Sequence, residues 1–407
     1  MQRILILGAG FAGLWCAAGA ARKLFESKPS NQPIEILVID ARSFHSIRVR
    51  NYELDLEDTR VPLADVLDPI GVKWLEGRVK QLDLTGHQVQ VQTASGEQTI
   101  DYTRLVFALG STLVRPKIPG LAEHALDVDA YEGALELRDH LASLPSQPAS
   151  SRRYTAVVIG AGLTGSEITA ELPERLAGIA GSRKSVRVIL MDRTPEIAQA
   201  MGGAQPVIER AMREMGVELR PGVTLKKISA RGVELDDGEI IEASTVIWCG
   251  GMRANALTAQ IPVASDELGR LPVDNSMRVQ GVDDVYAAGD SACSLIDGRR
   301  PSIMSCQYSR PMGRFAGHNV AADLLGLPLL PLRIDWYITC VDLGPWGAVY
   351  TQGRDRVLAT QGEQAKRTKR LINHERIYPP RTRNRDDILR AAAPEVDAPP
   401  PQNVATG

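Results

Sequence analysis

The sequence predicts an α/β fold that contains two copies of one β-α-β unit. The first copy begins RILILGAGFAGLWCAAGAARKL at Arg3, and the second begins TAVVIGAGLTGSEITAELPERL at Thr155. In each copy a β-branched run, a glycine turn and a helix-spaced segment precede a second β-branched run that ends in an acid. Gly8 matches Gly160 and Asp40 matches Asp192, both at an offset of 152 residues. This fixed offset indicates a duplicated unit.

Composition limits the classes of protein that fit. The 407 residues, 44% hydrophobic, are enough for two or three packed domains. A net charge of −2 gives no reason to expect nucleic acid as a partner. The apolar run that starts at Ile4 leads into a glycine loop, so we expect a strand rather than a signal peptide, and no stretch is long enough to span a membrane. The five cysteines lack metal-ligand spacing, so we expect a reducing compartment and no metal site.

The first glycine loop, Gly8-Ala9-Gly10-Phe11-Ala12-Gly13, has the spacing that binds a dinucleotide pyrophosphate. Glycine allows the tight turn and lets the backbone approach a phosphate, while the N-terminus of the next helix faces the anion. The spacing alone is a weak signal. Here a predicted strand precedes it, a helix follows, and Asp40 closes the next strand where a ribose could hydrogen-bond. We therefore predict a dinucleotide site rather than an empty turn.

The second glycine loop has the same features. It contains Gly160, Gly162, Leu163, Thr164 and Gly165. The matching acid, Asp192, suits the free 2′-hydroxyl of NADH and would repel the 2′-phosphate of NADPH. Arg193 follows directly and could pair with that phosphate. We therefore favour NADH and keep NADPH as the alternative.

The rest of the chain divides into smaller segments. The stretches 71–101 and 222–247 alternate polar and apolar residues and predict small antiparallel sheets. After Arg333, the segment IDWYITCVDLGPWGAVYTQG predicts a separate C-terminal layer. In the basic run 366–370 we expect Lys366, Arg367, Lys369 and Arg370 to form a solvated helix face. From 379 onward, proline, alanine and charge predict a disordered tail.

A third segment distinguishes the two sites. VDDVYAAGDSA, from Val282 to Ala292, resembles the T-x-x-x-x-[YF]-A-x-G-D signature of the two-dinucleotide-binding-domain flavoproteins, a branch of the pyridine nucleotide-disulfide oxidoreductase superfamily. LVFALGS, from Leu105 to Ser111, resembles the L-x-x-A-T-G segment of that family, with Leu109 in place of threonine. The resemblance implies that Asp290 contacts the ribityl chain of FAD. It places FAD in the first loop and the nicotinamide dinucleotide in the second.

The resemblance also implies the fold and its domains. The expected fold is two Rossmann-type domains, each a three-layer ββα arrangement, with the second inserted in the first and a small C-terminal α+β layer. The expected segments are 1–115 (FAD-binding, first part), 116–150 (connector), 151–255 (NAD(P)H-binding), 256–328 (FAD-binding, second part), 329–378 (C-terminal interface domain) and 379–407 (disordered tail).

The closest branch by resemblance is the type II NADH dehydrogenases, which pass electrons from NADH through FAD to quinone. GLTGSEITAEL and TVIWCGGMRAN match segments of that branch, and the first makes Glu167 the glutamate near the nicotinamide. SCQYSRPMG resembles the A-Q-x-A-x-Q quinone motif, with Cys306 and Gln307 in place but Pro311 at the second glutamine. Since ARSFHSIRVRNYEL after the first acid holds no cysteine pair, we do not expect thiol relay chemistry.

The resemblance and the loops together give a set of expected site residues. The expected catalytic residues are Glu167, which would contact the nicotinamide or move protons, and Gln307. The expected FAD-binding residues are Gly8, Gly10, Phe11, Ala12, Gly13, Asp40, Ala41, Arg42, Val79, Ala108, Leu109, Gly110, Gly289, Asp290, Cys306 and Gln307. The expected nicotinamide-site residues are Gly160, Gly162, Leu163, Thr164, Gly165, Asp192, Gly250 and Gly251.

Further expectations concern partners and neighbouring side chains. His45 could face the flavin, although a histidine in a loop is more often exposed. Trp336, Tyr337 and Trp346 could stack an acceptor, but aromatic residues more often fill a domain interface or a homodimer contact. KRTKRLINHERIYPP is basic with little apolar surface, so membrane contact would be peripheral at most. We expect a cytoplasmic protein, attached at most to the cytoplasmic face of the inner membrane.

Three functions follow from these patterns. The first is an FAD-dependent NADH dehydrogenase with a quinone-like acceptor. The second is a soluble NAD(P)H-dependent flavin reductase of a ferredoxin, a rubredoxin or a small molecule. The third belongs to another class, a flavin-binding interaction protein with vestigial redox activity.

Overall fold

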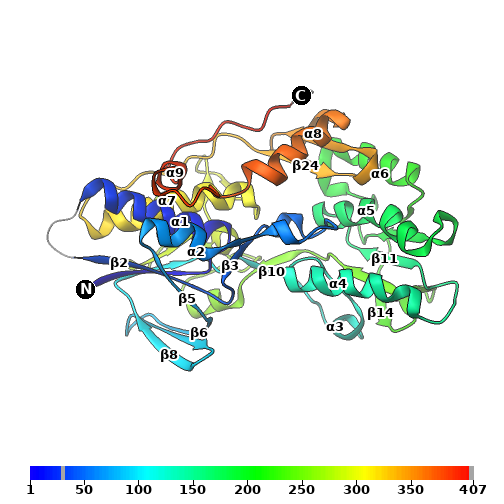
Figure 1. The fold of residues 1–407 in the computed structure, drawn as a ribbon, viewed down its shortest axis with the longest axis horizontal. Helices are drawn as coiled ribbons and strands as arrows, with labels where there is room; N and C mark the ends of the chain where they lie inside the picture. The colour runs from blue at the N-terminus through cyan, green and yellow to red at the C-terminus, as the bar shows by residue number, and fades with distance from the viewer. Residues whose placement is uncertain (29–32, 403–407) are drawn as a thin grey trace.

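A five-stranded parallel sheet forms the first unit. The computed structural model describes residues 1–28 and 33–402 (Figure 1). The sheet has the order β20-β9-β1-β2-β5. Its strands are β1 (Gln2–Leu7), β2 (Ile34–Asp40), β5 (Lys73–Glu76), β9 (Arg104–Phe107) and β20 (Val285–Ala287). Because β20 pairs with β9 in parallel, a segment that follows the second unit in sequence completes the sheet of the first.

A four-stranded parallel sheet, β13-β12-β11-β17, forms the second unit. Its strands are β11 (Thr155–Ile159), β12 (Arg187–Met191), β13 (Glu218–Arg220) and β17 (Thr245–Trp248). The order repeats β5-β2-β1-β9 of the first sheet, so the duplication seen in the sequence is a duplication of structure. The expected α/β fold with two Rossmann-type domains is thus confirmed. The domain boundaries remain a prediction.

Each unit carries a small antiparallel sheet where the sequence predicts one. The first sheet is β6 (Arg78–Asp83), β7 (Gln88–Thr93) and β8 (Gly96–Asp101). The second is β14 (Leu225–Ser229), β15 (Gly232–Leu235) and β16 (Ile240–Glu242). The short elements β3 (Phe44–Ser46), β4 (Arg60–Pro62) and α2 (Leu63–Leu67) lie between β2 and β5 of the first unit. The chain between the two units contains β10 (Ser111–Leu113), α3 (Leu121–His124) and α4 (Tyr131–Ser143), and β18 (Met252–Ala254) follows the second unit.

Two long helices pack against each other over the first sheet. They are α1 (Phe11–Ser27) and α7 (Cys306–Leu324). Their backbones are close because glycines lie at the contact: a Cβ on Gly313 would come 2.2 Å from the carbonyl oxygen of Ala12, and one on Gly317 would come 2.0 Å from that of Cys16. The second sheet is flanked by α5 (Leu163–Ala180) and α6 (Gln205–Glu214). In the part of the chain that the structure describes, we find no helix with the length and apolarity to cross a membrane.

The C-terminal layer is an antiparallel sheet followed by a helix. It comprises β24 (Ile338–Asp342), β25 (Ala348–Gln352), β26 (Val357–Gly362) and α8 (Glu363–Leu371). Val341 and Val349 join the core of the second unit. Of the aromatic residues considered from the sequence, Trp346 donates its Nε1–H to Glu214 on α6 at 2.7 Å. This layer therefore packs on the second unit within the same chain.

The expected disordered tail is wrong for residues 379–402. The helix α9 (Arg385–Ala391) is capped by Asn384, whose side chain accepts hydrogen bonds from the amides of Asp386 and Asp387. Its Ile388 and Leu389 are buried in the core of the first unit. The capping asparagine followed by an apolar pair gives a short helix enough contact to fold. Residues 403–407 lie outside the described residues, so the prediction is untested there.

Candidate active site

The first glycine loop connects β1 to α1 and forms an open cradle. Gly8 has φ of +95°, and a Cβ on Gly13 would lie 1.8 Å from the carbonyl oxygen of Gly8, so the turn requires glycine at both positions. A Cβ on Gly10, in contrast, would meet nothing within 4 Å among the described residues. The amide of Ala9 donates to Asp40 Oδ2 at 2.7 Å, which fixes the loop to the end of β2.

The second glycine loop repeats this geometry. Gly160 has φ of +105°, and the amide of Ala161 donates to Asp192 Oδ2 at 2.6 Å. The amide of Thr194 donates to Asp192 Oδ1 at 2.8 Å, as the amide of Arg42 does to Asp40 Oδ1 at 2.9 Å. Both helices begin at an open glycine, Gly10 or Gly162, and neither has a capping side chain among the described residues. Two helix N-termini are therefore free to bind phosphate.

The segment after β9 meets the segment after β20 beside the first loop only. Gly8 lies against the carbonyl of Ala108. A Cβ on Gly289 would lie 2.7 Å from the Cβ of Ala12. Asp290 accepts a hydrogen bond from Ser111 Oγ at 2.7 Å and one from Ser309 Oγ at 3.3 Å. The structure thus gathers the expected residues Phe11, Ala12, Ala108, Leu109, Gly110, Gly289 and Asp290 around one helix N-terminus.

The remaining expected residues lie at the edges of the two cradles. The amide of Gly77 donates to the carbonyl of Asp40, so the strand that carries Val79 begins beside that acid. Val79 itself is buried in the core, and Ala41 is exposed. Near the second loop, a Cβ on Gly160 would meet the carbonyl oxygen of Cys249 at 2.7 Å. This places Gly250 and Gly251 beside the second loop in the position that Leu109 and Gly110 occupy beside the first. Leu163, Thr164 and Arg193 are exposed.

His45 is buried, against the expectation of an exposed loop histidine. It lies in β3, and its Nδ1 is 2.9 Å from the carbonyl oxygen of Ala9. A carbonyl only accepts, so Nδ1 carries the hydrogen and Nε2 presents a lone pair with no partner among the described residues. Burial lowers the pKa of His45 to about 4, which keeps the ring neutral.

Glu167 lies in the second turn of α5 and is buried with a cation. Its Oε1 is 2.7 Å from Lys369 Nζ and accepts the amide hydrogen of Asp342 at 3.1 Å. Burial raises the pKa of the Glu167 carboxyl, and the nearby negative charge of Asp342 raises it further. Lys369 lowers this pKa, but the net shift is upward. A buried carboxyl with a raised pKa holds a proton more readily than an exposed one.

The expectation of a solvated basic face is wrong for Lys369. Its side chain is 9% exposed and also donates to the carbonyl of Cys340 at 3.1 Å. Burial alone would lower the pKa of Lys369, but the carboxylates of Glu167 and Asp342 raise it. Lys366 is likewise half of an ion pair, with Asp342. Ala365, Thr368 and Lys369 share the buried face of α8, and this helical spacing was the signal in the sequence.

Cys306 and Gln307 form the first turn of α7 in the first unit. The Gln307 amide donates to the carbonyl of Trp336 at 3.1 Å and accepts the amide hydrogen of Ile338 at 3.4 Å. Gln307 therefore ties α7 to the strand that carries Asp342. Cys306 lies in the first turn of α7, and burial raises the pKa of its thiol. The thiolate form of Cys306 is therefore disfavoured.

The residues present fit a flavin dinucleotide in the first cradle. The open position at Gly10, the uncapped start of α1, and the paired acids Asp40 and Asp290 supply a phosphate site and hydrogen-bond acceptors for hydroxyl groups. The second cradle has the loop and the first acid but no counterpart of Asp290 among the residues described above. A bound flavin would supply the acceptor for a hydride and the donor of two electrons.

The chain resembles known proteins over most of its length. Residues 2–313 match the family described as pyridine nucleotide-disulphide oxidoreductase. An NADH dehydrogenase-like protein of Mycobacterium tuberculosis is 49% identical over 403 residues, which cover 98% of this chain and 100% of the relative. Demethylphylloquinone reductase of Synechocystis is 27% identical over 361 residues, 85% of this chain and 86% of the relative.

Solved structures share the fold. A structure of NDH2 from Plasmodium falciparum in complex with NADH has a TM-score of 0.77 at 12% identity and covers 96% of this chain and 98% of its own. The sulfide:quinone oxidoreductase of Aquifex aeolicus has a TM-score of 0.74 at 20% identity, with 94% and 92% covered. These likenesses confirm the fold, and the family match confirms the resemblance and the enzyme class predicted from the sequence. The chain belongs to the pyridine nucleotide-disulphide oxidoreductase family.

Proposed function

We propose that this protein is an FAD-dependent NADH dehydrogenase that delivers electrons to a quinone-class acceptor. The observation that carries the proposal is the pair of matched glycine cradles, of which only the first is joined by Asp290. One cradle would hold FAD permanently, and the other would exchange NADH for NAD+. Relatives named as type II NADH:quinone oxidoreductases, such as that of Staphylococcus saprophyticus at 23% identity, support the same pair of substrates.

The residues of the chain supply positioning rather than bond chemistry. Asp192 would bind the ribose of NADH, because its carboxylate suits two hydroxyl groups and repels a 2′-phosphate. Glu167 and Lys369 would hold a proton close to the nicotinamide side of the site. Gln307, fixed to the strand of Asp342, would keep the first turn of α7 in place beside the acceptor. Excluding water from this region would favour hydride transfer between stacked rings.

The proposal extends to location and assembly. The basic C-terminal segment would allow peripheral contact with the cytoplasmic face of the membrane, where a quinone is reached. A homodimer through the C-terminal layer is the assembly we propose.

A half-reaction assay tests the proposal. Purified protein should be yellow, and NADH should bleach it under anaerobic conditions more readily than NADPH. Reoxidation by a short-chain quinone should be faster than by a ferredoxin or a rubredoxin. Faster turnover with either protein acceptor would favour a soluble reductase. A colourless protein that takes up no FAD would exclude both enzymes, and a flavin that NADH leaves oxidised would favour an interaction protein.

Asp192→Ala tests the nicotinamide site separately. We expect kcat/KM for NADH to fall about tenfold or more, since a hydrogen bond to a charged group contributes about 1.5–3 kcal/mol. The kcat/KM for NADPH should fall less, so the ratio of the two values, which measures the preference for NADH, becomes smaller. Asp236→Ala, an exposed acid in the turn between β15 and β16, is the matched control and should behave as wild type. An unchanged preference in Asp192→Ala would contradict the assignment.

A further inference from the structure

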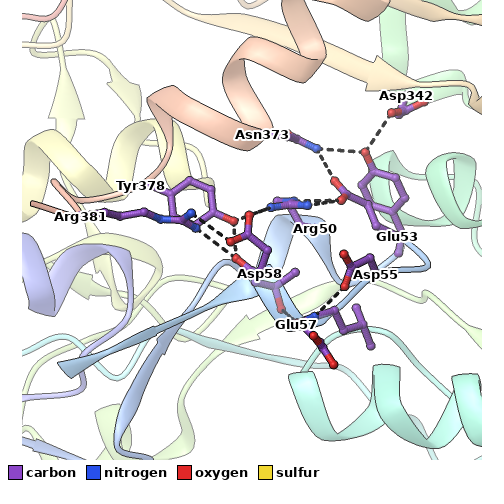
Figure 2. Close-up of polar contacts among 12 residues, drawn as sticks. Arg50, Glu53, Asp55, Glu57, Asp58, Asp342, Asn373, Tyr378 and Arg381 are labelled. Atoms are coloured by element: carbon purple, nitrogen blue, oxygen red, sulfur yellow. Dashed lines mark hydrogen bonds and ion pairs between the residues drawn. The ribbon is translucent and has the colours of Figure 1, made fainter. Parts of the chain in front are cut away.

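A continuous set of polar contacts runs from the Glu167–Lys369 pair to the surface. It joins the N-terminal segment that carries Tyr52 and Glu53, the end of β24 at Asp342, and Asn373 in the π-helical turn Ile372–Arg376 that follows α8 (Figure 2). These segments are far apart in sequence. No step of the proposed function uses the contacts beyond Lys369, so their arrangement calls for its own explanation.

The direction of each hydrogen bond follows from the outermost contact, the one between Arg50 and Glu53. Arg50 donates to Glu53 Oε2 from Nε at 2.9 Å and from Nη2 at 2.6 Å. Arginine only donates, so Glu53 is held there as an accepting carboxylate. Glu53 Oε1 lies 2.9 Å from the side-chain nitrogen of Asn373. Turning that amide round would set its oxygen against the carboxylate, so the nitrogen must face Glu53.

The same nitrogen orients Tyr52. Asn373 Nδ2 is 3.1 Å from the hydroxyl oxygen of Tyr52 and can only donate to it. The hydroxyl hydrogen of Tyr52 is then left for its other neighbour, Asp342 Oδ2, at 3.1 Å. Burial raises the pKa of Tyr52 well above its usual value, so the phenol keeps this hydrogen across the working pH range. Tyr52 is 2% exposed, so water does not compete for the bond.

Asp342 receives donors on both oxygens. Tyr52 donates to Oδ2, while Lys366 Nζ and the amide of Gly344, at 2.9 Å, donate to Oδ1. Donors on both oxygens hold this carboxylate in one orientation. Asp342 is 7% exposed, and its own backbone amide donates to Glu167. A carboxylate is therefore fixed one hydrogen bond away from the Glu167–Lys369 pair.

We propose that Asp342 is a positioning residue, held in place by Tyr52 and Asn373, whose carboxylate makes the Glu167–Lys369 pair retain a proton. The inference rests on the proposed function, because oxidation of NADH by a quinone balances only with one proton from solvent: NADH, a proton and the quinone give NAD+ and the quinol. NADH supplies two electrons and one proton as hydride, and the pair holds the second proton inside the protein. Tyr52 and Asn373 act through Asp342 and touch no reacting atom.

Several titratable groups surround Glu167, and they affect its protonation in different directions. The groups on α8 are Lys369 and Lys366, and those on β24 are Asp342 and Cys340. Tyr52 and Glu53 approach from the N-terminal segment, and Glu171 follows Glu167 by one turn of α5. Lys369 opposes protonation of Glu167, and burial of Glu167 together with Asp342 favours it. Of these groups, Asp342 has a donor network that fixes its position.

Asp342→Asn gives the direct test. Removing the anion lowers the proton affinity of the pair, so the pH above which quinone reduction declines should move down by about one unit, a typical effect of one neighbouring charge. Tyr52→Phe removes one of the donors to Asp342 and keeps the ring, so we expect a smaller shift in the same direction. Tyr378→Phe is the matched control. Its hydroxyl also contacts Arg50 but donates to the carbonyl of Asp58 on the outer side of Glu53, so its profile should equal that of wild type.

A spectroscopic readout keeps the test independent of turnover. The carbonyl stretch of the protonated Glu167 carboxyl, assigned by its loss in Glu167→Gln, can be titrated by infrared difference spectroscopy of the resting holoenzyme. Its midpoint should fall in Asp342→Asn and, by less, in Tyr52→Phe. Unchanged midpoints in both variants would overturn the inference. Shifted midpoints in a protein that does not oxidise NADH would leave the inference standing and refute the proposed function.

If Asp342→Asn fails to fold, Tyr52→Phe decides the outcome. That variant keeps the volume of the side chain and loses only a hydroxyl. A Tyr52→Phe protein with a wild-type infrared midpoint and a wild-type pH profile would show that the network serves stability alone.

Discussion

At the scale of single residues, the buried ion pair between Glu167 and Lys369 makes a stability prediction. The two side chains are 8% and 9% exposed. Glu167→Gln leaves the lysine charge buried without its partner, so we expect a loss of about 3–5 kcal/mol in the free energy of unfolding. The double variant Glu167→Gln/Lys369→Met removes both charges and should recover most of that loss. Urea unfolding monitored by circular dichroism measures both variants.

An exposed pair on the same helix provides the control. Glu363 and Arg370 are 61% and 58% exposed and lie 3.2 Å apart. Glu363→Gln should change the free energy of unfolding by less than about 0.5 kcal/mol, since exposed ion pairs contribute little. Equal losses in Glu363→Gln and Glu167→Gln, or no recovery in the double variant, would contradict the role assigned to burial.

At the scale of elements, the contact between α1 and α7 depends on glycine. A Cβ on Gly317 would lie 2.0 Å from the carbonyl oxygen of Cys16 and 2.8 Å from the amide of Ala20. Gly317→Ala must push the helices apart, and we expect a loss of about 1–3 kcal/mol in stability. Because α1 carries the first glycine loop, the fraction of protein that retains FAD should fall as well. Urea unfolding and the flavin-to-protein absorbance ratio measure the two effects.

Gly178 is the matched control for a glycine inside a helix. It lies on the exposed side of α5, and a Cβ there would meet nothing within 4 Å among the described residues. Gly178→Ala should stabilise the protein by about 0.5–1 kcal/mol, because alanine loses less backbone entropy in a helix. Gly317→Ala with the stability and flavin content of wild type would show that the two helices can separate freely.

How far the sequence predicts each element depends on the range of its contacts. The glycine loops and the acids Asp40 and Asp192 form within single β-α-β units, so local spacing predicts them. The repeated pattern also predicts the two sheets. The site around Glu167 forms differently: Tyr52 lies 290 residues from Asp342, and Glu167 lies 202 residues from Lys369. No local pattern brings them together: the helical spacing of Ala365, Thr368 and Lys369 indicates a buried face of α8 but not the side chains that it meets.

The prediction of a disordered C-terminal segment failed for a related reason. Its composition of proline, alanine and charge is typical of disorder, and composition says nothing of a partner surface. The structure provides that surface. Asp397 pairs with Arg314 on α7, and Tyr350 donates to the carbonyl of Pro400 at 3.0 Å. These two contacts, together with the buried Ile388 and Leu389 of α9, outweigh weak local propensity.

At the scale of the whole molecule, charge is balanced overall but concentrated at one side. The net charge is −2, yet residues 363–390 contain nine Lys and Arg against four Asp and Glu. α8 and α9, which carry most of this charge, lie along the same side of the molecule (Figure 1). Each cation near an anionic membrane contributes about 1 kcal/mol of attraction. Several of these cations already have acidic partners, such as Arg383 with Asp65, so the net attraction is weaker than the count suggests.

We therefore predict weak, salt-dependent binding to anionic vesicles. The protein should sediment with vesicles that contain phosphatidylglycerol at low ionic strength and leave them at roughly 0.5 M salt, where the screening length is about 4 Å. Vesicles of phosphatidylcholine alone should not bind it. Arg383→Glu/Arg390→Glu should weaken sedimentation, whereas Arg187→Glu/Arg231→Glu, an equal charge change in the second unit, should not. Retention on vesicles at high salt would mean that apolar insertion, rather than charge, attaches this chain, and equal losses in both double variants would mean that total charge matters and its location does not.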